Sequence, residues 1–167
     1  VTLPVSVLVE RSVIYNDNYY IAIEIAKMVF YMLCSDFWFF SLHYMSHRFK
    51  YLYNNIHKFH HRRHTTSCVS ALDANPIEHL IINIGSIMIG SMFFDRNIRT
   101  IKLWISLATM QVCVAHSGYR HCLVGKEHNL HHKLCKYNYG QGLYLLDRLC
   151  GTYKRNISKS TINPSDI

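Results

Sequence analysis

The chain lacks several signatures that would point to common metal sites. Its six cysteines include no C-x-x-C pair, which argues against a cysteine-ligated zinc site and against a disulfide framework. This cysteine usage fits a reducing, cytosol-facing compartment. No H-E-x-x-H sequence is present, so a zinc protease has no support. Carboxylates near the histidine clusters are few, namely Asp36, Glu127 and Asp147, so a metal there would rely on imidazole ligands.

Three apolar stretches lack the residues that end helices or oppose burial in lipid. Residues 19–42 contain neither Gly nor Pro, which predicts one long helix with enough length to span a bilayer. Residues 80–94 and 103–115 carry no charge, and the short basic turn between them predicts a helical hairpin. Each arm is shorter than the roughly 20 residues of a full span, so the hairpin either dips into the membrane or crosses it with help from flanking residues. A hairpin buried in a soluble protein is the alternative.

The charge balance is strongly basic. At 167 residues the chain is long enough for one domain, and its net charge is +8 with neutral histidines. Because the basic residues cluster beside long apolar runs, an anionic membrane surface is a better partner than nucleic acid. The positive-inside rule places the end of the first apolar stretch in the cytosol, because five basic residues follow it: Arg48, Lys50, Lys58, Arg62 and Arg63.

Histidine is the residue that the chain has in excess. Eight of its 12 histidines fall in three short motifs: an H-x-x-x-H pair at residues 43 and 47, and two H-x-x-H-H motifs at residues 57–61 and 128–132. On a helix, residues i, i+3 and i+4 share one face, so each motif would point two or three imidazoles in one direction. Imidazole suits iron, zinc, copper and nickel. Eight or more ligands are too many for one metal, so we expect two metals with four or five ligands each.

Two further positions have local roles that the sequence leaves open. Asp36 lies two helical turns before His43, so its carboxylate either orients a ligand imidazole or makes an ordinary polar contact inside the membrane. Pro76 predicts that a new helix begins near it, with Glu78 in the first turn complementing the helix dipole.

Metals held by neutral nitrogen ligands at a membrane suit one kind of chemistry. An apolar C–H bond has no acidic proton, so acid–base groups cannot break it and a metal-based oxidant has to abstract the hydrogen. The membrane supplies an apolar substrate and keeps competing water away. The histidine pattern therefore indicates oxygen activation on a hydrocarbon substrate.

The motifs together resemble the fatty acid hydroxylase/sterol desaturase superfamily of membrane non-haem di-iron enzymes. The order of the three histidine motifs matches, and residues 51–61 resemble the family's L-Y-x-x-x-H-K-x-H-H. Residues 75–78 resemble its H-P-x-E segment with Asn75 in place of histidine, and residues 116–119 resemble its H-S-G-Y. Residues 138–152 resemble its N-Y-G…W-D-R-x-x-G-T, with Leu146 in place of tryptophan. The resemblance covers about residues 36–155.

The resemblance implies an all-α fold, in which membrane-embedded helices carry a cytosolic, histidine-rich di-metal helical cap. It implies a catalytic domain over residues 19–155, with 1–18 as a linker or the remnant of an upstream segment and 156–167 as a polar tail. The metal ligands carried over by motif, with the first histidine of H-S-G-Y and a second histidine shortly after it, are His43, His47, His57, His60, His61, His116, His121, His128, His131 and His132.

The implied activity is O2-dependent hydroxylation or desaturation of a membrane lipid at two iron ions. Electrons would come from an external reductase through cytochrome b5 or a ferredoxin-type donor. A sterol ranks first as the substrate, a fatty acyl or sphingoid chain second, and a carotenoid ring third. In a eukaryote, the endoplasmic reticulum would be the location. A non-catalytic metal-binding membrane protein is the alternative from a different class.

Overall fold

The computed structural model describes residues 5–63, 66–94, 97–117 and 125–155. The described residues are helical or irregular, without a strand, which confirms the all-α expectation. In chain order the elements are α1 (Val5–Arg48), α2 (Lys50–Asn55), η1 (His57–Arg62), η2 (Cys68–Leu72), α3 (Pro76–Glu78), η3 (His79–Ile84), α4 (Gly85–Ile89), η4 (Gly90–Phe93), α5 (Ile98–Ala115), α6 (Gly125–Leu134) and α7 (Leu145–Leu149).

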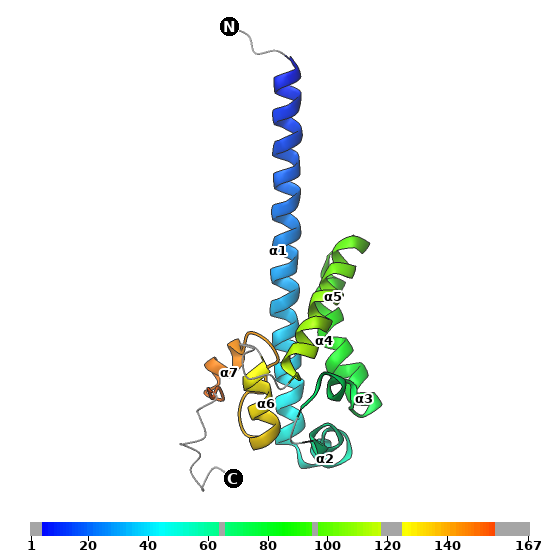
Figure 1. Cartoon of the computed structure of the whole chain (residues 1–167), viewed down its shortest axis with the longest axis vertical. Helices are drawn as coiled ribbons and strands as arrows, with labels where there is room; N and C mark the ends of the chain where they lie inside the picture. Colours follow the sequence, from blue (N-terminus) through cyan, green and yellow to red (C-terminus); the bar gives the residue numbers. More distant parts are fainter. Residues whose placement is uncertain (1–4, 64–65, 95–96, 118–124, 156–167) are drawn as a thin grey trace.

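Helix α1 is the axis of the molecule. It has 44 residues, so it begins well before the predicted start after Asn18 and continues past the predicted end at Leu42. Its sequence contains no Gly or Pro, and the Asn-Asp-Asn run at residues 16–18 weakens a helix without breaking it. The extra turns at the C-terminal end carry His43 and His47. Figure 1 shows α1 running the length of the structure, with the remaining elements gathered around its lower part.

The predicted hairpin is present, and its arms are longer than expected. The first arm is one continuous helical run from Pro76 to Phe93, built from α3, the π-helix η3, α4 and the 3-10 helix η4. The second arm is α5. As predicted, Pro76 occupies the first turn of the new helix, and the Asn75 side chain caps it by accepting from the backbone N–H of Ile77.

Small residues and two tryptophans hold this hairpin against α1. A Cβ atom placed on Gly90 would lie only 2.7 Å from the Cα atom of Tyr31, so the two backbones touch there. Tyr31 is buried with Trp104 of α5 in the core cluster. The Trp104 indole donates to the carbonyl oxygen of Ile87, and the Trp38 indole donates to that of Ile81 in the π-helix. The close approach of the three helices is therefore specified by both packing and hydrogen bonds.

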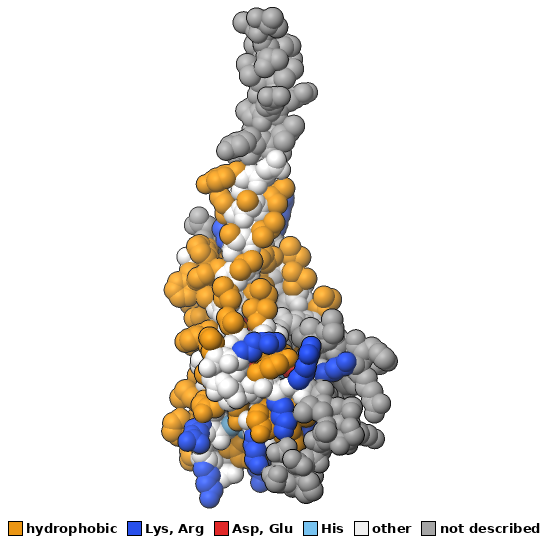
Figure 2. Space-filling model, turned by 90° about the vertical axis from the view of Figure 1, so that its left-hand side faces the viewer, with side chains coloured by type: hydrophobic (Ala, Val, Ile, Leu, Met, Phe, Trp, Pro, Cys, Tyr) orange, Lys and Arg blue, Asp and Glu red, His pale blue; other side chains and the backbone are white. Residues whose placement is uncertain are grey.

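Three helical segments are long and apolar enough to cross a membrane: Asn18–Arg48, Pro76–Phe93 and Ile98–Ala115. On α1, exposed apolar side chains recur every four residues and form one outward stripe, consisting of Ile21, Ile25, Val29, Leu33 and Phe37. Figure 2 shows hydrophobic side chains over the middle of the molecule and Lys and Arg side chains near its lower end. This surface is what an integral membrane protein requires, because lipid rather than water covers the apolar band.

Candidate metal centre

Nine of the ten predicted ligands meet at the lower end of α1 and fall into two groups. The first histidine group consists of His43, His47, His57, His61 and His131. The second histidine group consists of His60, His116, His128 and His132. Within each group, one ligand nitrogen per residue lies within 4.8 Å of all the others. The tenth predicted ligand, His121, lies outside the described residues.

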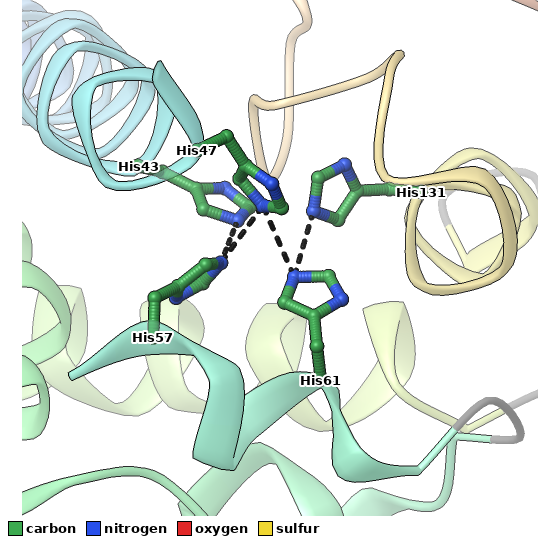
Figure 3. A group of neighbouring side chains, drawn as sticks. All are labelled: His43, His47, His57, His61 and His131. Carbon is green, nitrogen blue, oxygen red and sulfur yellow. Dashed lines mark hydrogen bonds between the residues drawn. The ribbon is translucent and has the colours of Figure 1, made fainter. Parts of the chain in front are cut away.

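Four separate elements deliver these side chains. The last turns of α1 place His43 and His47 one turn apart, with ring centroids 5.0 Å apart. The first H-x-x-H-H motif lies on the 3-10 helix η1 rather than on the α-helix predicted from its spacing, and the second lies on α6 as predicted. His116 follows the last residue of α5. Figure 3 shows the five rings of the first histidine group converging from α1, η1 and α6.

The two H-H doublets join the groups. In each doublet one ring belongs to the first histidine group and its neighbour to the second: His61 and His60 on η1, and His131 and His132 on α6. Across the doublets, the His61 and His132 rings stack with centroids 4.6 Å apart. The two groups are therefore adjacent halves of one centre.

Backbone carbonyl oxygens determine which ring nitrogen of several histidines is free to bind a metal. The Nδ1–H of His43 donates to the Tyr139 carbonyl at 2.6 Å, and that of His131 donates to the Tyr137 carbonyl at 2.7 Å. The Nδ1–H of His116 donates to the Val112 carbonyl at 3.0 Å. Because a carbonyl oxygen can only accept, each neutral ring carries its proton on Nδ1 and leaves a lone pair on Nε2.

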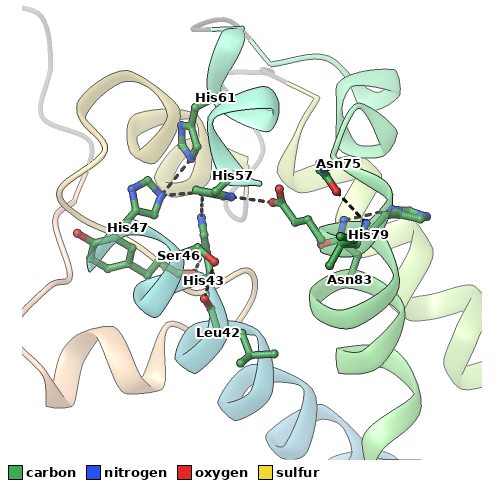
Figure 4. A network of polar contacts seen from close by, with 12 residues as sticks. Leu42, His43, Ser46, His47, His57, His61, Asn75, His79 and Asn83 are labelled. Carbon is green, nitrogen blue, oxygen red and sulfur yellow. Dashed lines mark hydrogen bonds and ion pairs between the residues drawn. The ribbon is translucent and has the colours of Figure 1, made fainter. Parts of the chain in front are cut away.

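His57 has a carboxylate in the same role. Its Nδ1–H donates to Oε1 of Glu78 at 2.7 Å, and its Nε2 lies 3.1 Å from Nε2 of His43. Figure 4 shows His57 joined to His43 and His47 on one side and reaching the helical arm of Asn75, His79 and Asn83 on the other. Two lone pairs facing each other at this distance repel unless a cation lies between them. The first histidine group therefore fits a metal ion.

The second histidine group fits a metal for another reason. Both ring nitrogens of His132 are buried without a hydrogen-bond partner, and so is Nδ1 of both His60 and His128. A buried polar atom without a hydrogen-bond partner costs about 1–3 kcal/mol. The concentration of such atoms in one place therefore indicates a missing ligand. The absence of a carboxylate from both groups, among the described residues, gives an all-imidazole donor set that suits iron, zinc or copper better than magnesium or calcium.

Burial also keeps these imidazoles neutral. Removal from water lowers the pKa of His60 to about 3 and that of His132 to about 2, with neighbouring imidazoles adding to the effect. The same causes hold the pKa of His128 and His131 well below the ordinary value. A neutral imidazole has the lone pair that a metal needs, so the site needs no proton release before it binds a metal at neutral pH.

The segment that follows α6 is held by one buried aspartate. Asp147 accepts hydrogen bonds from the backbone N–H groups of Tyr139 (2.8 Å) and Gly140 (2.6 Å) and from the Thr152 hydroxyl (2.6 Å). Asn138 donates to the Lys154 carbonyl and accepts from the Lys154 N–H. These contacts hold the Tyr139 carbonyl against His43. The N-Y-G…D-R-x-x-G-T motif thus supports His43, a candidate metal ligand, from behind.

Of the two roles that the sequence left open for Asp36, the described contacts fit an ordinary polar contact rather than the orientation of a ligand imidazole. Asp36 lies about 10 Å along α1 from His43, which is too far for its short side chain to bridge. The structure places its buried carboxylate beside the backbone amide groups of Leu143, Tyr144 and Leu145 instead. The residue that the sequence reasoning missed is Glu78, which was assigned to the helix dipole. Its place in the H-P-x-E-like segment was the available signal.

A narrow cavity lies against both histidine groups. It is lined by the rings of His43, His57, His60 and His116, and also by Glu78, Phe39, Val112 and Gln141. The cavity faces the membrane helices. Phe39, Ile82 and Val112, one from each of the three candidate membrane helices, contribute to its lining.

Comparison with known proteins agrees with this site. A family model described as fatty acid hydroxylase matches residues 28–152. A putative methylsterol monooxygenase of Dictyostelium discoideum is 27% identical over 158 residues, covering 86% of this chain and 58% of that protein. Sphinganine C4-monooxygenase 2 of Arabidopsis thaliana is 30% identical over 139 residues, covering 76% and 54%. A methylsterol monooxygenase of Aspergillus fumigatus is 34% identical over 142 residues, covering 72% and 47%.

The chain spans about half the length of these curated relatives. No solved structure matches it. The matched region contains every described member of both histidine groups, together with Glu78 and Asp147. The chain belongs to the fatty acid hydroxylase family, within the fatty acid hydroxylase/sterol desaturase superfamily that its motifs resemble.

Proposed function

We propose that this protein oxidises a membrane lipid with molecular oxygen at a pair of iron ions held by the two histidine groups. The observation that carries the proposal is the pair of buried all-imidazole groups, five and four residues strong, next to a cavity that faces the membrane helices. In the hydroxylation reaction, a lipid C–H bond, O2, two electrons and two protons yield a C–OH group and water. Loss of a second hydrogen would give an alkene instead.

The chain's own residues prepare this chemistry. The carbonyls of Tyr139, Tyr137 and Val112 aim Nε2 of His43, His131 and His116 inward. Glu78 does the same for His57, and with cations bound nearby its carboxylate would be ionised and add negative charge behind the ligands. Bound there, two iron ions would activate dioxygen and supply the oxidant for an unactivated C–H bond. Burial of the rings keeps water from the reacting groups.

The substrate ranking follows the relatives and the motifs. Proteins named methylsterol monooxygenase and sphinganine C4-monooxygenase match most of the chain, which supports a sterol first and a sphingoid or fatty acyl chain second. A carotenoid ring ranks third. We infer that cytochrome b5 or a ferredoxin-type protein supplies the electrons. The basic residues after α1 favour a cytosolic position for the histidines, at the endoplasmic reticulum in a eukaryotic cell.

The test combines metal analysis with lipid analysis of the full-length protein purified from membranes. We expect about two iron ions per chain by mass spectrometry and a new oxidised lipid in an expressing host supplied with methylsterol or sphinganine. His131→Ala and His132→Ala each remove one ligand from a different group, so each should lower metal content and abolish product. Full activity of His131→Ala would exclude the di-iron assignment. Bound metal without any lipid product would favour a non-catalytic metal-binding protein.

A further inference from the structure

A second pocket lies on the membrane side of the histidine groups, and we call it the membrane-side pocket. It is enclosed by α1, α4, α5 and the segment at residues 141–143. Apolar side chains such as Met32, Ile87 and Trp104 form much of its wall. Ser35, Asp36 and Gln111 bring polar groups into this otherwise apolar lining. A pocket of this composition suits an amphipathic molecule.

The membrane-side pocket adjoins the narrow cavity beside the histidines, and side chains separate the two. Phe39, Val112 and Gln141 line both this pocket and the narrow cavity beside the histidines. The Phe39 ring lies against the His43 ring, with centroids 5.1 Å apart. A molecule seated in the pocket would therefore be separated from the metal ligands only by side chains that border both spaces.

Asp36 is the group in this pocket that needs a partner. Its side chain is more than nine-tenths buried, and its Oδ1 atom makes no hydrogen bond within the described part of the chain. A buried carboxylate oxygen without a donor is costly, and an ionisable residue inside a membrane helix commonly marks a substrate path. The nearby backbone amides of Leu143–Leu145 leave this oxygen unsatisfied. A ligand O–H group would supply the missing hydrogen bond.

Gln111 of α5 also lines the membrane-side pocket. Its Nε2 atom donates to the Gln141 carbonyl oxygen at 3.3 Å. A Cβ atom on Gly142 would lie 2.1 Å from the same Nε2, so this position can hold Gln111 only because residue 142 has no side chain. Asp36 and Gln111 thus present polar groups from two different membrane helices to one small space.

We propose that the membrane-side pocket binds the alcohol end of a lipid, with Asp36 accepting a hydrogen bond from the lipid hydroxyl and Gln111 bordering it. A carbon close to that hydroxyl then lies at the wall formed by Phe39 and Val112, beside the histidine groups. The apolar remainder of the lipid extends along the exposed faces of α1 and α5. This inference rests on the proposed lipid oxidation, and it makes Asp36 a determinant of specificity for lipid alcohols, of sterol or sphingoid type.

Direct binding tests this proposal without requiring turnover. The full-length protein in detergent is titrated with a methylsterol and its 3-O-methyl ether in one arm, and with sphinganine and its 3-O-methyl ether in the other. We expect an alcohol to bind at least about tenfold more tightly than its ether in one arm, because a hydrogen bond to a charged group is lost in the ether. The arm that shows the preference identifies the class of lipid alcohol that binds, either sterol or sphingoid. Equal binding of alcohol and ether in both arms would overturn the proposal.

Three variants locate the effect. Asp36→Asn should reduce the alcohol-to-ether preference to less than about threefold while bound metal stays unchanged, because the substitution keeps the shape and removes the charge. Gln111 lines the same pocket from α5, and Gln111→Met keeps the size of the side chain. This variant should also weaken binding of the alcohol, so the proposal can still be tested if Asp36→Asn folds poorly. Ser41→Ala is the matched control, because the Ser41 hydroxyl binds only the Phe37 carbonyl of its own helix.

An unchanged preference in both pocket variants would refute the role of Asp36. A wild-type protein that shows the preference but yields no oxidised lipid would instead contradict the proposed function and leave the binding site intact. The two failures are thus distinguishable.

Discussion

Nδ1 of His57 lies 2.7 Å from Oε1 of Glu78, and both side chains are almost completely buried. Among the hydrogen bonds that orient the two histidine groups in the described residues, this is the one whose acceptor is a carboxylate. Burial raises the pKa of Glu78 to about 8 in the metal-free protein, and cations bound at the histidines would favour its ionised form, which would place a negative charge behind His57. The positive charge of two metal ions bound by neutral imidazoles would otherwise be poorly compensated in a buried environment.

Glu78→Gln should therefore weaken metal binding about 10- to 100-fold, because loss of such an acceptor removes charge while the Gln carbonyl can still accept from His57. Competition with a chelator, read as retained iron per chain, measures this. Glu24→Gln makes the same change about 50 residues earlier in α1, where Glu24 contacts Lys27 and Thr100 rather than a histidine. Equal retention in Glu78→Gln and wild type would contradict the role of Glu78.

Asp147→Asn should destabilise the protein by about 3 kcal/mol or more, because it breaks a buried carboxylate contact with two backbone N–H groups and Thr152. Thermal unfolding in detergent measures the change, and metal retention should fall with it as the Tyr139 carbonyl leaves His43. Asp73→Asn is the control: Asp73 pairs with the exposed Arg62 and Arg63, and its loss should leave both readouts near wild type. Similar behaviour of the two variants would argue against the anchoring role.

Gly90→Ala should force η4 away from α1, because the new Cβ would lie 2.7 Å from Cα of Tyr31, a backbone atom that no side-chain rotation can move aside. Overpacking of this kind costs about 1–3 kcal/mol, measured as a lower unfolding temperature in detergent. Gly151→Ala is a useful comparison. Residue 151 has φ +70° with nothing within 4 Å of a new Cβ, so it should cost only the backbone strain of about 1–2 kcal/mol and leave the helix packing unchanged. Crosslinking between α1 and η4 would separate the two effects.

The metal-free protein should lose stability as the pH falls below about 6.5. Burial places the folded-state pKa of His60 at about 3 and lowers the pKa of His57, His128 and His131 as well. The unfolded chain then binds more protons than the folded chain, so stability is complete above the ordinary value of 6.5 and declines toward the folded pKa, by up to about 1.4 kcal/mol per pH unit for each group. Unfolding temperatures of chelator-treated protein between pH 5 and 8 test this. A flat profile would show that the rings are not buried as described.

Much of the helical architecture was predictable from the sequence. The hairpin follows from two charge-free stretches around a basic turn, and its start at Pro76 follows from proline chemistry. The beginning of α1 was predicted too late, at residue 19, because the prediction followed the apolar stretch, while no residue just before that stretch stops a helix. The first H-x-x-H-H motif was placed on an α-helix, whereas it forms a 3-10 turn. Short segments next to a packed site adopt the backbone that satisfies their side chains, which local spacing does not reveal.

The sequence by itself determined that imidazoles would be concentrated at one end of the membrane helices, because the spacing of histidines and apolar stretches is a local property. It also predicted which histidines would come together, through motifs that the family shares. Only the tertiary structure decided how the histidines divide: each H-H doublet contributes one ring to each histidine group, which depends on how η1 and α6 come together beside the end of α1. The same holds for Asp36 and Glu78. Their distances to the rings arise from contacts between segments far apart in the chain, so Glu78 rather than Asp36 lies behind a ligand, and Asp36 faces the membrane-side pocket.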